Sequence, residues 1–415
     1  MEKTVLEIAN QALVNIALLL LLGIVAAKVA EKLKLPDIIL YLLMGMFTGP
    51  MGLNLLMIPS DSALNHAFLT LGAAVLLFHG GVGVQFTILK QVWRSLVLAA
   101  TLSVLIMILI VGYAAHWLLG IDLSVAFLLA AIIAPTDPAA LVPIFTSVNI
   151  KEKLSQTIIS ESAFNDATAA IMTFTILTVV TTGEFSLIST LSQFLRMAGG
   201  GILCGAFWGL TSLYLISDRS NNMFANFSKL LVLPVIIGTY FSAEHFGASG
   251  FMAVFVAGLL WGNNEELGWA IKKIHRKEVT SFIHIISTIF TIAIFVLLGS
   301  HIEFSLLTKH LFSGLAIVGI FMFVARPIAV LAFALADQKA NWQKNEMIFM
   351  MWTRETGVIP AALIGMLTSY HLESLETISS VVILTILITL ILQPATTKLL
   401  AKRLNLLIQK KETGK

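Results

Sequence analysis

The chain is poor in cysteine and in charge. Among its 415 residues is one cysteine, Cys204, which cannot form an internal disulfide and has no nearby histidine to suggest a metal site. Only 12% of the residues are charged, whereas 58% are hydrophobic, and the mean hydropathy is +0.92. These proportions exclude an ordinary soluble domain, and we expect no nucleic-acid partner. The sequence therefore predicts a polytopic membrane protein.

Long polar loops are also missing. A bilayer core about 30 Å thick needs roughly 20 apolar residues per helix. The predicted fold class is all-α, with about 13 transmembrane helices: 9–31, 37–57, 66–88, 93–119, 123–148, 154–182, 190–216, 228–246, 249–263, 279–300, 310–336, 345–369 and 376–400. We expect a single transmembrane domain over residues 1–404, followed by a short basic cytoplasmic tail at 405–415.

The Lys and Arg residues are distributed unequally between the two sides of the membrane that these thirteen spans define. Sorting the 26 Lys and Arg residues by side places 21 after odd-numbered spans or in the tail, two on the opposite side and three inside spans. Cytoplasmic loops carry the excess of Lys and Arg in membrane proteins. A wrong helix count would destroy the asymmetry, so the pattern favours thirteen spans. It predicts a multi-pass protein of the cell membrane, with the N-terminus outside and the C-terminus in the cytoplasm.

Proline is scarce as well, yet three of the ten prolines lie within nine residues of the fifth span, in the stretch Ala134 to Pro143. Each proline removes a backbone donor and clashes with the preceding turn, so a continuous helix is not expected there. Interrupted helices at membrane depth line cavities and bind ions in transporters. Asp137 lies at this break, preceded by Thr136. The plain alternative is that Asp137 caps the second half of its own helix.

The twelfth span carries a second polar interruption, Thr353 to Pro360, which includes Arg354 and Glu355. Spans 5 and 12 are seven spans apart. Two inverted six-helix repeats, spans 1–6 and 8–13 with span 7 between them, would place these interrupted spans at equivalent positions. Paired interruptions of this kind are the best sequence indication of a transporter site.

The sixth span contains the most polar stretch of the chain, Ser160 to Asp166. Helical geometry places Ser162 and Asp166 on one face, with Asn165 beside them, and turns Glu161 toward a neighbouring helix. The first three side chains supply oxygen ligands suited to an alkali cation. An ionisable group at membrane depth persists when it pairs or lines a wet cavity.

Arg326 on the eleventh span needs an anion, and Glu161 is the candidate partner for a structural ion pair. His79 on the third span is interpreted either as a hydrogen-bonded structural residue or as a pH sensor near the site. Arg354 and Glu355 are further candidates for a place near the site.

These residues resemble the NhaP branch of the monovalent cation:proton antiporters, relatives of the mammalian sodium/proton exchangers. The motifs that carry the resemblance are Thr136-Asp137-Pro138, Glu161-Ser162 followed by Asn165-Asp166, and Arg326. The resemblance implies that Asp166 exchanges a proton for a cation, with Thr136, Asp137, Ser162 and Asn165 around the ion. It also implies a Glu161–Arg326 ion pair, a homodimer and an elevator-like core built from helices at about 123–182 and 345–400.

The predicted function is secondary active antiport, in which Na⁺ or K⁺, with Li⁺ as a further candidate, is exchanged for protons in pH homeostasis. An enclosed carboxylate holds either a proton or a cation, so binding of one expels the other. Asn165 beside Asp166 leaves one carboxylate there, which predicts electroneutral exchange. No cofactor and no enzymatic activity are expected. A cation channel is the alternative, and an intramembrane hydrolase is a weaker one.

Overall fold

The computed structural model describes residues 5–33, 35–137, 145, 150–217, 224–269, 271–301, 308–370, 372 and 374–407. The second half of the predicted fifth span, including Pro138 and Pro143, lies outside the described residues, as does the tail from 408 to 415. The regular structure of the described residues is helical, apart from one β-bridge that joins Ile150 to Leu407.

The thirteen predicted segments all contain helix, and the first six span-forming units are α1 (Val5–Leu33), α2 (Asp37–Thr48), α3 (Ala63–Gly83), α4 with η1 and α5 (Phe86–Leu119), α6 (Leu123–Ile133) and α8 (Glu152–Thr182). The seventh is α9 (Leu187–Ile216). The last six are α10 (Ser228–His245), α11 (Gly250–Gly262), α12 (Lys273–Ser300), α14 with η3 and α15 (Leu311–Ala336), α16 (Lys344–Trp352) with α17 (Val358–Met366), and α18 (Leu375–Arg403). By length and composition, nine described helices can cross a membrane, and four shorter apolar helices fill the remaining places.

The prediction for the second span was too long. Helix α2 ends at Thr48, and residues 49–62 form turns instead of continuing to residue 57. Proline at position 50 disfavours helical backbone in Gly49, the residue before it. Gly49 is extended, and its N–H donates to the carbonyl of Gly45 to close the helix.

Three matched features support the inverted repeat. The interruptions lie in spans 5 and 12, at residues 134–137 directly after α6 and at residues 353–357 between α16 and α17. A single π-helical turn occurs in span 4, as η1 (Ala99–Ser103), and in span 11, as η3 (Phe321–Ala325). Such turns are uncommon and mark functional positions. Among the described residues, these two features occur in spans that are seven apart, as the predicted repeat requires.

The third matched feature is a pair of close helix crossings. Helix α2 meets α12 where Gly45 lies against Gly299, and α3 meets α11 where Gly81 lies against Gly258. A Cβ atom at any of these glycines would overlap the facing backbone. Small residues permit this closeness between membrane helices.

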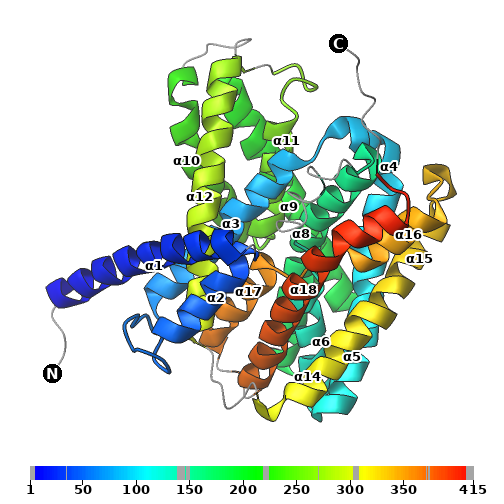
Figure 1. The fold of residues 1–415 in the computed structure, drawn as a ribbon. Helices are drawn as coiled ribbons and strands as arrows, with labels where there is room; N and C mark the ends of the chain where they lie inside the picture. The colour runs from blue at the N-terminus through cyan, green and yellow to red at the C-terminus, as the bar shows by residue number, and fades with distance from the viewer. Residues whose placement is uncertain are drawn as a thin grey trace.

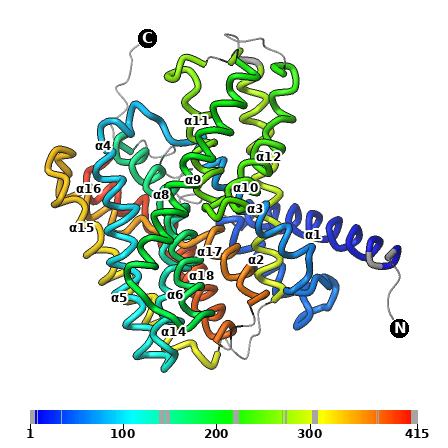
Figure 2. Tube along the Cα trace, turned by 180° about the vertical axis from the view of Figure 1, so that it is seen from behind, coloured from blue at the N-terminus to red at the C-terminus, as the bar shows by residue number. Residues whose placement is uncertain are grey.

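The helices form two groups that meet where α8 and α17 pack against α3, α11 and α12 (Figures 1 and 2). One group, called the core body here, consists of α4, α5, α6, α8 and α14 to α18, which pack on one another. The other, the scaffold, contains α1 to α3 and α9 to α12. Large apolar side chains such as Phe312 and Trp117 remain 85% and 84% exposed, as expected of surfaces that face lipid.

Candidate functional site

The two interrupted spans meet at their breaks. Helix α6 ends at Ile133, where Pro135 cannot continue the hydrogen-bond ladder, and α16 ends at Trp352. Between these ends, the backbone N–H of Asp137 donates to the carbonyl of Glu355 at 2.9 Å. The non-helical stretches therefore satisfy part of each other's backbone, as buried polar groups in a membrane must.

Charged side chains at the crossing lie at helix ends. The guanidinium of Arg354 donates to the carbonyl of Ala134, at the C-terminal end of α6. The carboxylate of Asp137 accepts from the N–H of Val358 at 3.0 Å, at the N-terminal end of α17. Each charge has the sign that stabilises the helix end it contacts. Asp137 thus caps α17, a half-helix of span 12. The capping alternative from sequence named the second half of span 5 instead, which lies outside the described residues.

Gly357 makes this arrangement possible. A Cβ atom at that position would overlap the carboxylate and the Cβ of Asp137. The φ of Gly357 is −138°, outside the left-handed region. Glycine is therefore required here by the close approach of Asp137.

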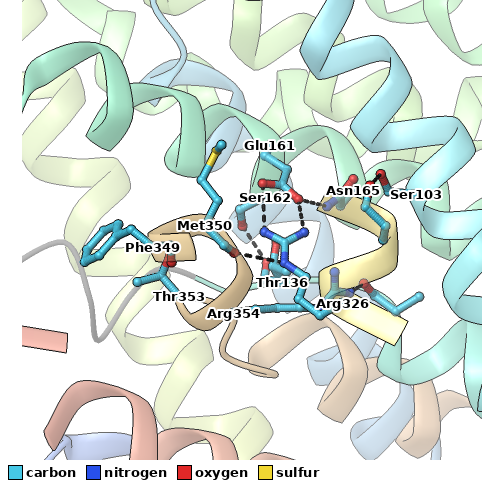
Figure 3. A network of polar contacts seen from close by, with 12 residues as sticks. Ser103, Thr136, Glu161, Ser162, Asn165, Arg326, Phe349, Met350, Thr353 and Arg354 are labelled. Carbon is cyan, nitrogen blue, oxygen red and sulfur yellow. Dashed lines mark hydrogen bonds and ion pairs between the residues drawn. The ribbon is translucent and has the colours of Figure 1, made fainter. Parts of the chain in front are cut away.

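The predicted ion pair between Glu161 on α8 and Arg326 on α15 is present. The guanidinium of Arg326 binds both carboxylate oxygens of Glu161, with Nη2 to Oε2 at 3.0 Å (Figure 3). Its Nε donates to the carbonyl of Met350 at 3.1 Å. Both charged side chains are 1% exposed. Asn165 also contributes, because its amide donates to Glu161 at 3.4 Å. Arg326 thereby ties α15 to α8 and α16.

Several oxygens near this pair have no hydrogen-bond partner among the described residues. The Ser162 hydroxyl donates to the carbonyl of Thr136 at 2.5 Å, which places the start of the break against α8 (Figure 3). The Thr136 hydroxyl, the Asn165 carbonyl oxygen and one Asp166 carboxylate oxygen are enclosed and unpartnered. Asp137 and Arg354 are the charged groups that act electrostatically on Asp166. Asn165 therefore serves both the structural pair and this set of oxygens.

Sequence reasoning missed two residues of α18 that complete the crossing. The Gln393 side chain accepts from the backbone N–H of Arg354 at 2.8 Å, and the Thr389 hydroxyl accepts from that of Thr356 at 3.0 Å. A signal was available, because buried polar residues recur every four positions along this apolar helix: Thr385, Thr389, Gln393 and Thr397.

His79 on α3 lies beside His284 on α12. Its ring centre is 6.1 Å from that of His284, and it lines a hollow of about 270 Å³ bordered by α11 and α12. Neither Asp166 nor Asp137 lines that hollow. Of the residues predicted near the site, Arg354 and the backbone of Glu355 lie at the crossing.

This geometry can be compared with known proteins. A family model described as "Sodium/hydrogen exchanger, transmembrane" matches residues 16–403. The chain belongs to the sodium/hydrogen exchanger family. The solved structure of the sodium proton antiporter MjNhaP1 from Methanocaldococcus jannaschii at pH 8 matches with a TM-score of 0.82 and 29% identity, over 95% of this chain and 98% of that one. The fold predicted from sequence is thereby confirmed.

Relatives within the exchanger family are named for two different cations, Na⁺ and K⁺. Over 363 residues, the chain is 32% identical to Na(+)/H(+) antiporter 1 of Methanocaldococcus jannaschii, covering 84% of this chain and 81% of that protein. Over 365 residues, it is 29% identical to the K(+)/H(+) antiporter NhaP of Alkalimonas amylolytica, covering 86% of this chain and 60% of that protein. The predicted family resemblance is confirmed, and the channel alternative gains no support from these relatives.

Proposed function

We propose that this exchanger-family protein exchanges a monovalent cation for protons across the membrane, with Asp166 as the carboxylate that both ions share. The observation that carries the proposal is the set of enclosed, unpartnered oxygens on Thr136, Asn165 and Asp166. Buried polar atoms are nearly always hydrogen-bonded, so an unpartnered set of them calls for an explanation. Oxygen ligands are the ones that alkali cations prefer, and Ser162 and Asp137 adjoin the set.

The mechanism follows from competition at one carboxylate. Asp166 holds a proton or a cation, and each ligand neutralises the charge that must cross the membrane. Alternating access requires one body of the protein to move against another. That body is the core body defined above, which adds the fourth and eleventh spans to the helices expected from sequence because they pack on α6, α8 and α18.

Electroneutral exchange is the expected stoichiometry. Asp137 already accepts a hydrogen bond at the N-terminal end of α17, where negative charge is stabilised. We therefore expect Asp166 to be the carboxylate that exchanges its proton for the cation during the cycle. Relatives named for Na⁺ and for K⁺ make both ions candidates for this chain.

The proposal also includes an orientation in the membrane and a homodimer. The distribution of Lys and Arg supports an external N-terminus and a cytoplasmic C-terminus. A homodimer is supported by α1, which packs mainly along α2 and α12 and extends away from the rest of the scaffold (Figures 1 and 2). Its surface carries exposed leucine side chains such as Leu13 and Leu21. The proposal includes transport but no enzymatic reaction, which agrees with membership of a transporter family.

Proton flux in proteoliposomes tests the proposal. A trapped pH dye is followed while Na⁺, K⁺ or Li⁺ is added in turn, and we expect saturable proton movement with at least one of them. Asp166→Asn is expected to abolish it. The matched control is Asp61→Asn, which removes an exposed carboxylate far along the chain from the site. Cation-driven proton flux that persists in the Asp166→Asn protein would refute the assignment, and flux that does not saturate would indicate a channel.

A further inference from the structure

A hollow of about 410 Å³ lies in the core body, and residues next to Arg326 and Met350 line it. Three elements form it: the η3 turn with the start of α15, the helix α16, and the C-terminal half of α18. Its walls are mainly apolar and include Met322, Pro327, Met351, Trp352 and Leu400. Phe323 and Leu399, which also line it, are 63% and 53% exposed, so the hollow opens to the surroundings of the protein.

Arg403 lines the same hollow. It is exposed, and it forms no ion pair or hydrogen bond within the described part of the chain. Arg403 lies in the last turn of α18, a helix long and apolar enough to cross the membrane, so its guanidinium belongs near a membrane surface. An apolar hollow with a cation at one end matches an acyl chain joined to a phosphate, because guanidinium groups bind phosphate oxygens strongly.

We propose that this hollow binds one anionic phospholipid, with an acyl chain against Trp352 and the headgroup phosphate on Arg403. The lipid belongs to the cytoplasmic leaflet, an assignment that rests on the orientation proposed above. That leaflet carries the anionic lipids that attract basic side chains. Binding itself depends on the hollow and on Arg403, whatever ion the protein transports.

The walls of the hollow also support the ion-site network. Pro327 follows Arg326, and Met351 follows Met350, whose carbonyl accepts from the Arg326 side chain. A lipid in the hollow therefore contacts both residues that adjoin this hydrogen bond.

Trp352 links the hollow to the second break. Its indole N–H donates to the Thr396 hydroxyl at 2.8 Å, and its ring centre lies 6.0 Å from that of Phe323. Arg354 is two residues further along the chain and lies over the ring of Phe321, in the same η3 turn as Phe323. A bound lipid is thus positioned to restrict movement of Arg326 and Arg354, and we expect it to change the transport rate without touching the ion.

Native mass spectrometry of the full-length protein measures the binding. The protein is incubated with phosphatidylglycerol or with phosphatidylcholine of the same acyl chains. We expect one phosphatidylglycerol retained per chain in preference to phosphatidylcholine, and Arg403→Gln should weaken retention about fivefold, the effect of about one basic residue near an anionic surface. Lys402→Gln removes the same charge one residue away, at an exposed position that does not line the hollow, and should leave retention unchanged. Equal loss in both variants, or no preference between the lipids, would overturn the site.

Fluorescence locates the acyl chain. Phosphatidylglycerol with brominated acyl chains quenches nearby tryptophans, of which the chain has seven. We expect a saturable component of quenching that disappears in Trp352→Phe. Its persistence in that variant would place the acyl chain elsewhere and contradict the proposal. Neither binding measurement requires transport, so failure of the lipid site and failure of the antiport proposal are distinguishable.

Discussion

The carboxylate of Asp137 and the backbone amide of Val358, 221 residues apart in the chain, are joined by a 3.0 Å hydrogen bond. The reciprocal contact runs from the Arg354 guanidinium to the carbonyl of Ala134. Each interrupted span therefore supplies the charge that compensates a helix end of the other span. The two contacts place charges of opposite sign at opposite helix ends, and in the proposed mechanism Asp166 is the group whose charge depends on its ligand.

Substitutions of Asp137 distinguish its role as a helix cap of α17 from the role of its negative charge. Asp137→Asn keeps a side-chain oxygen that can accept from Val358, whereas Asp137→Ala removes the acceptor. We expect the alanine variant to lose about 1 kcal/mol of stability, the usual effect of losing a helix cap, and the asparagine variant to lose much less. Both should transport poorly because the negative charge is gone. Thermal unfolding in detergent and proteoliposome flux measure the two effects. Equal stability of the alanine variant and the unchanged protein would contradict the capping role.

Gly357→Ala is expected to stop transport while the protein still inserts and remains helical. The added methyl group overlaps Asp137, so either the Asp137–Val358 hydrogen bond or the Asp137–Glu355 backbone bond must lengthen. The matched control is Gly319→Ala in α14, where a Cβ atom has no atom within 4 Å. Wild-type flux in the Gly357→Ala protein would show that the close approach is not needed.

The Glu161–Arg326 pair is expected to show strong coupling. Glu161→Gln or Arg326→Met alone leaves a buried charge unpaired and should cost about 3 to 5 kcal/mol of unfolding free energy. The double variant removes both charges and should lose less than the two single losses added together. Glu31→Gln breaks the exposed Lys28–Glu31 pair and should change stability by less than about 1 kcal/mol. Additive losses in the double variant would mean that the two side chains act independently.

Sequence periodicity was sufficient to place most helices and to separate Glu161 from Asp166, because an apolar span and a helix face are local properties. The end of α2 was missed although Pro50 marks it, since residues 53–58 are apolar enough to extend a hydropathy window. The contact between Asp137 and the N-terminal end of α17 was not predicted, for a different reason. Which helix end lies beside a carboxylate depends on how two distant segments cross, and no local pattern encodes that crossing.

The α18 polar stripe offers the most closely matched test of the crossing. Thr385 and Thr389 are both buried, and each hydroxyl donates to the carbonyl four residues earlier in its own helix. The difference is that the Thr389 hydroxyl also accepts from the backbone N–H of Thr356 at 3.0 Å. Valine at either position has a similar shape and removes the hydroxyl.

We expect Thr389→Val to destabilise the protein by about 1 to 3 kcal/mol, because it leaves the Thr356 N–H buried without an acceptor. Thr385→Val should cost clearly less, since the loss is limited to a bond within its own helix. The difference in stability between the two variants, measured by thermal unfolding in detergent, gives the contribution of the hydrogen bond from the Thr356 N–H. Transport should fall with Thr389→Val as well, because Thr356 precedes Gly357 and any shift of that backbone moves the Asp137 contact. If both valine variants unfold at the same temperature, the contact between α18 and the twelfth-span break does not stabilise the crossing.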